Sequence, residues 1–182
     1  MVFSSLTFLC IFLPVVLALY YLLPTLRIRN VLLIAVSLLF YAYGEPVYVL
    51  LMIASIIINY IFGRLLGTEN KKKRQWILAI AVVINIGLLV VFKYLDMMVQ
   101  TVNQLCGSEI PLVGLALPIG ISFFTFQALS YVIDVYRREV EPQKNLWNVM
   151  LYISFFPQLI AGPIVKYHDI HEQIDNRNTD VK

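Results

Sequence analysis

Residues 117–139 of this chain read LPIGISFFTFQALSYVIDVYRRE, a hydrophobic segment that carries polar side chains along a single helical face. A helix turns once every 3.6 residues, so positions three and four apart lie on one face. The pattern predicts a helix with a polar stripe that needs protein, water or substrate beside it. The polar stripe consists of Gln127, Ser130, Tyr131, Asp134 and Arg138, whereas Ile121, Phe124, Ala128 and Val135 point to other faces.

Asp134 is the ionisable residue that lies deepest in this segment. An ionisable residue is costly in the core of a bilayer, so Asp134 should lie near the interface or face the protein interior. Arg137 and Arg138 follow at i+3 and i+4, the spacing at which helical side chains pair. Asp134 is therefore either part of a helix-end ion pair, which we favour, or a candidate for direct catalysis.

The composition predicts an integral membrane protein, since 60% of the 182 residues are hydrophobic and 14% are charged. A soluble globule needs more polar residues to cover its surface. The net charge of +3 comes from separated loop clusters, which argues against a nucleic-acid-binding protein. Cys10 and Cys106 show neither a CxxC nor a Cys/His spacing, so we predict no disulfide framework and no metal site there.

Apolar segments alternate with polar connections, which predicts an all-α polytopic membrane protein with about five to six transmembrane or re-entrant helices. A helix needs about 20 residues to cross a hydrocarbon core of ~30 Å. The first segment lacks the basic region and cleavage site of a signal peptide, so we expect it to be retained. The predicted spans in this single domain, 1–182, are residues 3–23, the short 31–43, 47–66, 76–92, the 117–139 helix and a last stretch at 146–167.

Two further segments have helical spacing without enough apolar length to cross. Residues 94–106 alternate apolar and polar side chains at helical spacing and predict an amphipathic helix in the membrane interface. The polar tail, residues 168–182, predicts a solvated surface helix. Its His168 and His171 lie at i and i+3, where they could face one metal ion, but no third ligand is evident.

The last apolar stretch, LWNVMLYISFFPQLIAGPIVKY, cannot form one uninterrupted helix, because prolines interrupt it at two places. Broken backbone at membrane depth is tolerated only where protein or a water-filled cavity covers it. We therefore expect this broken element to line a tunnel or cavity. The residues at its breaks are Pro157, Gln158, Gly162 and Pro163.

Two pairs of small or polar residues occur within the spans. Asn59 and Asn85 lie in mid-span, where a hydrogen bond between helices is the usual role of an asparagine. Gly63 and Gly67 form a GxxxG spacing at a helix end, where helix termination explains them at least as well as close packing.

Basic residues gather in alternate connections, which predicts an extracytoplasmic N-terminus by the positive-inside rule. The connections at 24–30, 64–75 and 137–145 are then cytoplasmic. The polar tail would lie outside if the last stretch crosses the membrane fully and inside if that stretch is re-entrant. The charge of the tail favours re-entrance.

Two stretches of the sequence, LPIGISFFTFQALSYVIDVYRRE and FFPQLIAGPIVKYHDI, together resemble the membrane-bound O-acyltransferases, in particular their bacterial alginate O-acetylation branch. The opening stretches FSSLTFLCIFLPVVLALYYLLP and RNVLLIAVSLLFYAYGEP are similar to the first helices of that branch. The resemblance implies a multi-pass enzyme of the bacterial cytoplasmic membrane with an embedded tunnel and no bound cofactor. It implies acyl transfer, often of acetyl, from a cytoplasmic thioester donor such as acetyl-CoA to an extracytoplasmic polysaccharide, commonly with an extracytoplasmic partner protein.

No catalytic residue carries over from this resemblance. The family's catalytic histidine lies in membrane-embedded structure downstream of the matched region, whereas His168 and His171 directly follow GPIVKY. Acyl transfer to a hydroxyl needs a positioned base, usually a histidine, and no predicted span contains one. We expect the N-terminal portion of a larger acyltransferase, inactive alone, with its polar stripe partly uncovered toward lipid.

Other functions stay open at this point. Within the same family, the chain could belong to an enzyme that transfers D-alanyl groups to teichoic acid. A small transporter or channel-like protein would also use a polar stripe and a broken helix, although internal repeats and paired intramembrane charges are absent from the sequence. A structural partner subunit of a full-length acyltransferase is a further alternative.

Overall fold

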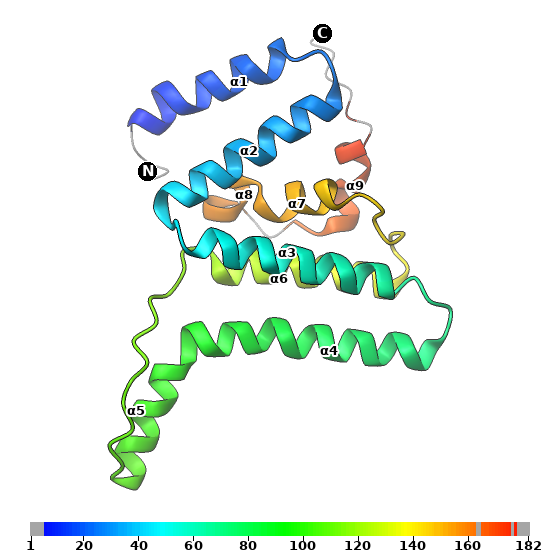
Figure 1. Ribbon diagram of the computed structural model, residues 1–182. Coiled ribbons are helices and arrows are strands. Elements are labelled where there is room, and N and C mark those ends of the chain that lie inside the picture. Colours follow the sequence, from blue (N-terminus) through cyan, green and yellow to red (C-terminus); the bar gives the residue numbers. More distant parts are fainter. Residues whose placement is uncertain (1–5, 163–164, 176, 178–182) are drawn as a thin grey trace.

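The computed structural model describes residues 6–162, 165–175 and 177, and every regular element in that part of the chain is a helix (Figure 1). Three of these helical segments are long and apolar enough to cross a membrane, and a fourth is a shorter apolar one. The predicted all-α fold is therefore confirmed, and the chain is a multi-pass membrane protein. The long segments are Leu26–Gly44, Tyr48–Leu65 and Lys71–Cys106, and the shorter one is Phe8–Leu22.

The first two helices run antiparallel along one side of the molecule (Figure 1). A π-helical segment, η1 (Phe8–Phe12), continues directly into α1 (Leu13–Leu22), and α2 (Leu26–Gly44) follows after a short connection. The prediction that this second span is short, 31–43, is wrong. Arginine is a good helix former, so Arg27 and Arg29 extend the helix, and its 19 residues reach about 28 Å.

The middle of the chain forms a helical hairpin with a long extension. Helix α3 (Tyr48–Leu65) is followed by α4 (Lys71–Leu89), whose first turn is capped by Asn70 Oδ1 accepting from the Lys73 N–H at 3.2 Å. The predicted start at residue 76 is therefore too late, because the basic run is helical. A π-helical turn, η2 (Val90–Tyr94), leads to α5 (Leu95–Cys106), which confirms the predicted amphipathic segment as a helix.

Helix α6 (Ile121–Arg137) is the centre of the fold and packs against α3, α4, α7, α8 and α9. Ten of its seventeen residues are buried. Gly120 precedes the helix with a positive φ of 75°. A Cβ added to Gly120 would lie 3.5 Å from Leu159. The stretch singled out in the sequence is thus the helix around which the others assemble (Figure 1).

The last apolar stretch is interrupted, as predicted. It forms α7 (Leu146–Ser154) and α8 (Phe156–Ala161), with the non-helical Phe155 (φ −55°, ψ 109°) between them and Pro157 in the first turn of α8. The second break includes Gly162, which has an extended conformation, whereas Pro163 lies outside the described residues.

Helix α9 (Tyr167–Asp175) brings the chain back to the end of the bundle from which α7 starts (Figure 1). The His168 N–H donates to Asp134 Oδ2 at 3.1 Å, and Asn30 Nδ2 donates to the Ile174 carbonyl at 3.0 Å. These contacts hold α9 beside the ends of α2 and α6. The predicted surface helix is present, because residues 168–173 are exposed or half-buried, and Ile174 is its buried contact with the bundle.

Two contacts between neighbouring helices involve the asparagines and the GxxxG glycine discussed for the spans. Asn59 and Asn85 exchange hydrogen bonds of 3.1 and 2.8 Å between α3 and α4, which confirms the predicted interhelical pair. Gly63 lies against Tyr131 so closely that an added Cβ would come within 2.3 Å of the tyrosine hydroxyl. Of the two roles that the sequence left open for Gly63, the structure favours close packing of α3 on α6.

Candidate functional site

The polar stripe of α6 is covered by protein along most of its length. Gln127, Tyr131 and Asp134 are at most 4% exposed, and Ser130 is half-buried beside the hydroxyl of Tyr152. The expectation that the stripe is partly uncovered toward lipid is wrong for the three buried residues. The physical reason is that other helices cover these side chains: Tyr131 lies against Gly63 of α3 and the Tyr167 ring of α9, and Asp134 accepts from the His168 N–H of α9.

Arg138 leaves the stripe, because it follows the last turn of α6 in a left-handed conformation with φ 63°. Its guanidinium forms an ion pair with Glu69, and Arg137 pairs with Glu139 at 3.7 Å. The predicted pairing of Asp134 with these arginines is therefore wrong. Asp134 faces inward, toward the first turn of α9, while both arginine side chains are exposed.

Three tyrosines join the broken element to α6. Tyr131, Tyr152 and Tyr167 are almost completely buried, and the Tyr167 ring lies 4.9 and 5.0 Å from the other two in edge-to-face contacts. The Tyr152 hydroxyl donates to the Val165 carbonyl at 2.8 Å, and Gln143 Nε2 donates to the Tyr167 hydroxyl at 3.1 Å. These contacts hold the returning backbone after the second break in one position.

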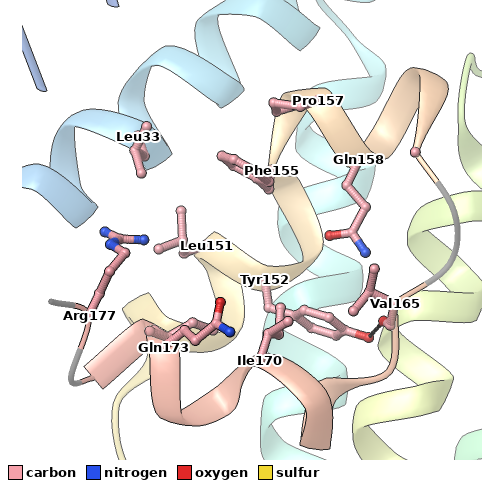
Figure 2. A pocket seen from close by; sticks show the side chains of 12 residues that line it. Leu33, Leu151, Tyr152, Phe155, Pro157, Gln158, Val165, Ile170, Gln173 and Arg177 are labelled. Atoms are coloured by element: carbon pink, nitrogen blue, oxygen red, sulfur yellow. Dashed lines mark hydrogen bonds between the residues drawn. The ribbon is translucent and has the colours of Figure 1, made fainter. Parts of the chain in front are cut away.

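A cavity of about 360 Å³ lies between α2, α7, α8 and α9 (Figure 2). Its wall is mainly apolar, and its polar side chains are Tyr152, Gln158, Gln173 and Arg177. Three of the four residues predicted at the breaks, Pro157, Gln158 and Gly162, line this cavity, so the broken element does line a cavity. The polar stripe residues of α6 are not among its lining residues.

Part of this wall comes from the tail, where no site had been predicted. Ile170, Gln173, Ile174 and Arg177 line the cavity, and Arg177 Nη2 donates to Asn30 Oδ1 at 2.7 Å. Their spacing of three, four and seven residues is the pattern of one helical face. That amphipathic spacing was the signal in the sequence that the tail packs against the protein.

A charged cluster lies where α9 begins and α6 ends. One ligand-type atom each from Asp134, Glu139 and His168 lies within 4.8 Å of the others. His171 is not part of this group, because its Nδ1 lies 2.8 Å from the His168 carbonyl oxygen. The structure thus pairs His168 with two carboxylates and not with the neighbouring histidine, a set that linear spacing in the sequence did not indicate.

The sequence is similar to named bacterial O-acetyltransferases, although no family model and no solved structure matches it. It is 39% identical to the "Probable alginate O-acetylase AlgI" of Pseudomonas aeruginosa and 38% identical to that of Azotobacter vinelandii, in both cases over 97% of this chain. It is 31% identical to the "Peptidoglycan O-acetyltransferase" of Helicobacter pylori over 80% of its length. The chain spans 32–36% of the length of these relatives.

These relatives match along almost the whole chain, including both stretches that carried the resemblance in the sequence. The broken helix, the central α6 and the cavity all fall inside the matched region. The chain therefore belongs to the membrane-bound O-acyltransferase family.

Proposed function

We propose that this chain forms the membrane anchor and part of the tunnel wall of an O-acyltransferase. The enzyme would transfer an acyl group, with acetyl as our choice, from a cytoplasmic thioester donor such as acetyl-CoA to hydroxyls of an extracytoplasmic polysaccharide. The observation that carries this proposal is 37–39% identity, over 97% of the chain, to relatives named alginate O-acetylases. The relative named a peptidoglycan O-acetyltransferase supports a polysaccharide acceptor.

The cavity beneath the broken helix suits the acyl end of the donor. Its volume of about 360 Å³ falls within the range of small-molecule sites, about 300–1,000 Å³, and its apolar lining would limit hydrolysis of a thioester by water. Gln158 and Gln173 supply amide groups that can orient a carbonyl. Arg177 supplies a cation for a phosphate-bearing donor at the tail side of the cavity.

In this proposal, the catalytic base is not one of the residues that line the cavity. The residues that line the cavity include no histidine, and His168 faces carboxylates elsewhere. Following the family resemblance, we assign the general base to a membrane-embedded histidine outside these 182 residues. The cavity described here would then position the acyl group while that base removes the proton of the acceptor hydroxyl.

The orientation of the chain is also a proposal. Arg27, Arg29, the basic run 71–74 and the 137–145 connection lie at one end of the bundle, together with α9 (Figure 1). We place this end in the cytoplasm of a bacterial cell and the N-terminus outside, because basic residues favour the cytoplasmic side. An extracytoplasmic partner protein would then approach the opposite end, where α5 and the residues that follow it lie.

The test of this function is ester formation in cells. A bacterial strain whose exopolysaccharide lacks O-acetyl groups receives either the whole genomic locus or a gene for the 182 residues. We expect base-labile acetate on the polysaccharide with the locus and none with the 182 residues alone. Within the locus, Gln158→Leu should lower the acetate content, whereas Thr101→Ala, on the exposed α5, should not.

Two outcomes separate the alternatives. Base-labile D-alanine in place of acetate would favour the second activity within the family. Absence of any ester, with the protein present in the membrane, would contradict the acyltransferase proposal. The polar stripe no longer supports the transporter alternative, because three of its residues are buried against other helices and do not line the cavity.

A further inference from the structure

The cluster of Asp134, Glu139 and His168 has the composition and spacing of a metal site. Asp134 lies in the last turn of α6, Glu139 directly after that helix, and His168 in the first turn of α9. His168 Nδ1 lies 3.6 Å from Asp134 Oδ2 and 3.4 Å from Glu139 Oε2. These distances are long for hydrogen bonds, but two ligands on a tetrahedral zinc ion, with bonds of about 2.0–2.1 Å, lie about 3.4 Å apart.

The other ring nitrogen of His168 fixes the tautomer that a metal ligand needs. His168 Nε2 lies 2.9 Å from Asp169 Oδ1, so it carries the proton and donates to that carboxylate. Nδ1 then presents a lone pair toward Asp134 and Glu139. A carboxylate that accepts from the far side of a ligating imidazole is the usual outer partner in zinc sites, where it orients the ring and raises its basicity.

The described residues offer no hydrogen-bond partner for the Nδ1 atom of His168. His168 Nδ1 is buried and makes no hydrogen bond among the described residues. A nitrogen lone pair and two carboxylate oxygens repel one another at these distances, and a cation between them would remove that repulsion. The nearby arginines do not supply this cation, since Arg137 contacts the other oxygen of Glu139 and Arg138 pairs with Glu69.

We propose that Asp134, Glu139 and His168 bind one divalent metal ion, Zn²⁺ by preference, with Asp169 as the outer partner of the histidine. One nitrogen and two oxygen ligands suit zinc, and its charge offsets the two carboxylates. A water molecule would complete the coordination from the side on which Glu139 is exposed. This site is independent of the acyltransferase proposal.

The proposed metal ion would fasten α9 to the central helix. Helix α9 carries Ile170, Gln173 and Ile174, which line the cavity, and its first turn touches α6 through the His168 N–H and Asp134. Its other end is held by the bond from Asn30 to the Ile174 carbonyl. Metal binding would therefore stabilise the wall that the tail contributes to the cavity.

The test is metal stoichiometry of the full chain in detergent. The protein is stripped with EDTA, exposed to ZnCl₂, freed of unbound metal by gel filtration and measured by mass spectrometry of zinc. We expect one zinc per chain and a higher midpoint of thermal unfolding with zinc than without it. Glu139→Gln and His168→Ala should abolish stoichiometric binding, and Asp169→Asn should weaken it by about 10–100-fold.

Controls keep a folding defect apart from a lost ligand. Glu139 is exposed, so its substitution should leave the apo protein as stable as the wild type, even if a change at the buried Asp134 does not. His171→Ala removes the neighbouring histidine and should retain full zinc binding. Absence of zinc in the wild type would overturn the proposal. Zinc content that is the same in His168→Ala as in the wild type would also overturn it.

Discussion

Helices α5 and α6 carry similar mixtures of apolar and polar residues at helical spacing, yet their surroundings are opposite. Ten residues of α6 are buried, whereas α5 contains no buried residue. Helix α6 packs against α3, α4, α7, α8 and α9, while α5 packs on η2 and extends away from the bundle (Figure 1). The difference shows that helical spacing identifies a helix, and that contacts from distant parts of the chain decide which of its faces is buried.

The polar groups of the two helices follow the same division. On α5 they bond within the helix or to the connection that follows it: Thr101 Oγ1 donates to the Met97 carbonyl, and Asp96 accepts from the Val113 and Gly114 N–H groups, both at 3.0 Å. At the end of α6, Arg74 of α4 donates to the Val135 carbonyl at 3.4 Å and also to the Tyr136 carbonyl. Substitutions around α6 should therefore destabilise the protein, and substitutions on α5 should not.

The largest effect is expected for Gly63→Val. An added Cβ would lie 2.3 Å from the Tyr131 hydroxyl and 2.5 Å from a ring carbon, and Tyr131 is fully buried, so α3 and α6 must separate. We expect a loss of roughly 3 kcal/mol in the free energy of unfolding, the upper part of the usual range for overpacking. Unfolding by SDS in mixed micelles measures it. Gly87→Val on α4 is the matched control, because nothing lies within 4 Å of a Cβ there, and an equal loss in both variants would contradict the proposed packing.

The second effect concerns the basic run at the start of α4. Lys71, Lys72 and Lys73 are exposed, but Arg74 is buried and satisfies carbonyls at the end of α6, with its guanidinium 5.2 Å from the centre of the Tyr136 ring. Arg74→Ala removes the side-chain donor of the Tyr136 carbonyl, whereas the Val135 carbonyl still accepts from the Arg138 N–H. The substitution should cost about 2 kcal/mol in the same SDS titration. Lys72→Ala should change the free energy of unfolding little. A similar stability for both variants would show that Arg74 acts only as a surface charge.

The sequence predicted the elements of this fold better than their environments. The order of the helices, the break before Pro157 and the Asn59–Asn85 pair followed from local patterns, because proline chemistry and mid-span amides constrain structure directly. The sequence predicts a span of 31–43 that is shorter than α2, since it places Arg27 and Arg29 in a connection although arginine also extends helices.

The candidate site was harder to predict from the sequence than the helices were. His168 meets Asp134 across 34 positions, and Tyr131 meets Gly63 across 68, so no local periodicity contains either contact. The inward direction of Asp134 depends on α9 covering it, which required the chain to return after the second break. A pattern within one helix could place Asp134 and the arginines on neighbouring turns, but it could not show that the arginines would turn outward.

A third effect, of about 1 kcal/mol, is expected at the pair of asparagines between α3 and α4. Asn59 and Asn85 are buried, and each donates to the other and to a backbone carbonyl of its own helix. Asn59→Leu or Asn85→Leu alone should each cost roughly 1 kcal/mol, because the remaining amide loses its partner inside the membrane. The double variant should cost less than the sum of the two. A double-mutant cycle in SDS titrations measures the coupling, and strictly additive losses would mean that the two side chains act independently.

The smallest effect on stability is expected on α5, where the comparison with α6 is sharpest. Met98→Trp and Gln100→Trp change exposed residues two positions apart, so they lie on nearly opposite faces of an amphipathic helix. Neither should change the free energy of unfolding by more than about 0.5 kcal/mol, because neither side chain packs against the bundle. Their fluorescence should differ, however, when Trp76 and Trp147 are replaced by Phe and the protein is placed in bilayers of brominated lipid. Strong quenching at position 98 with weak quenching at position 100 would locate α5 in the membrane interface, as its spacing predicts. Equal quenching at the two positions would mean that both faces of α5 lie in the same environment, either lipid or water. That result would contradict an interfacial location of α5.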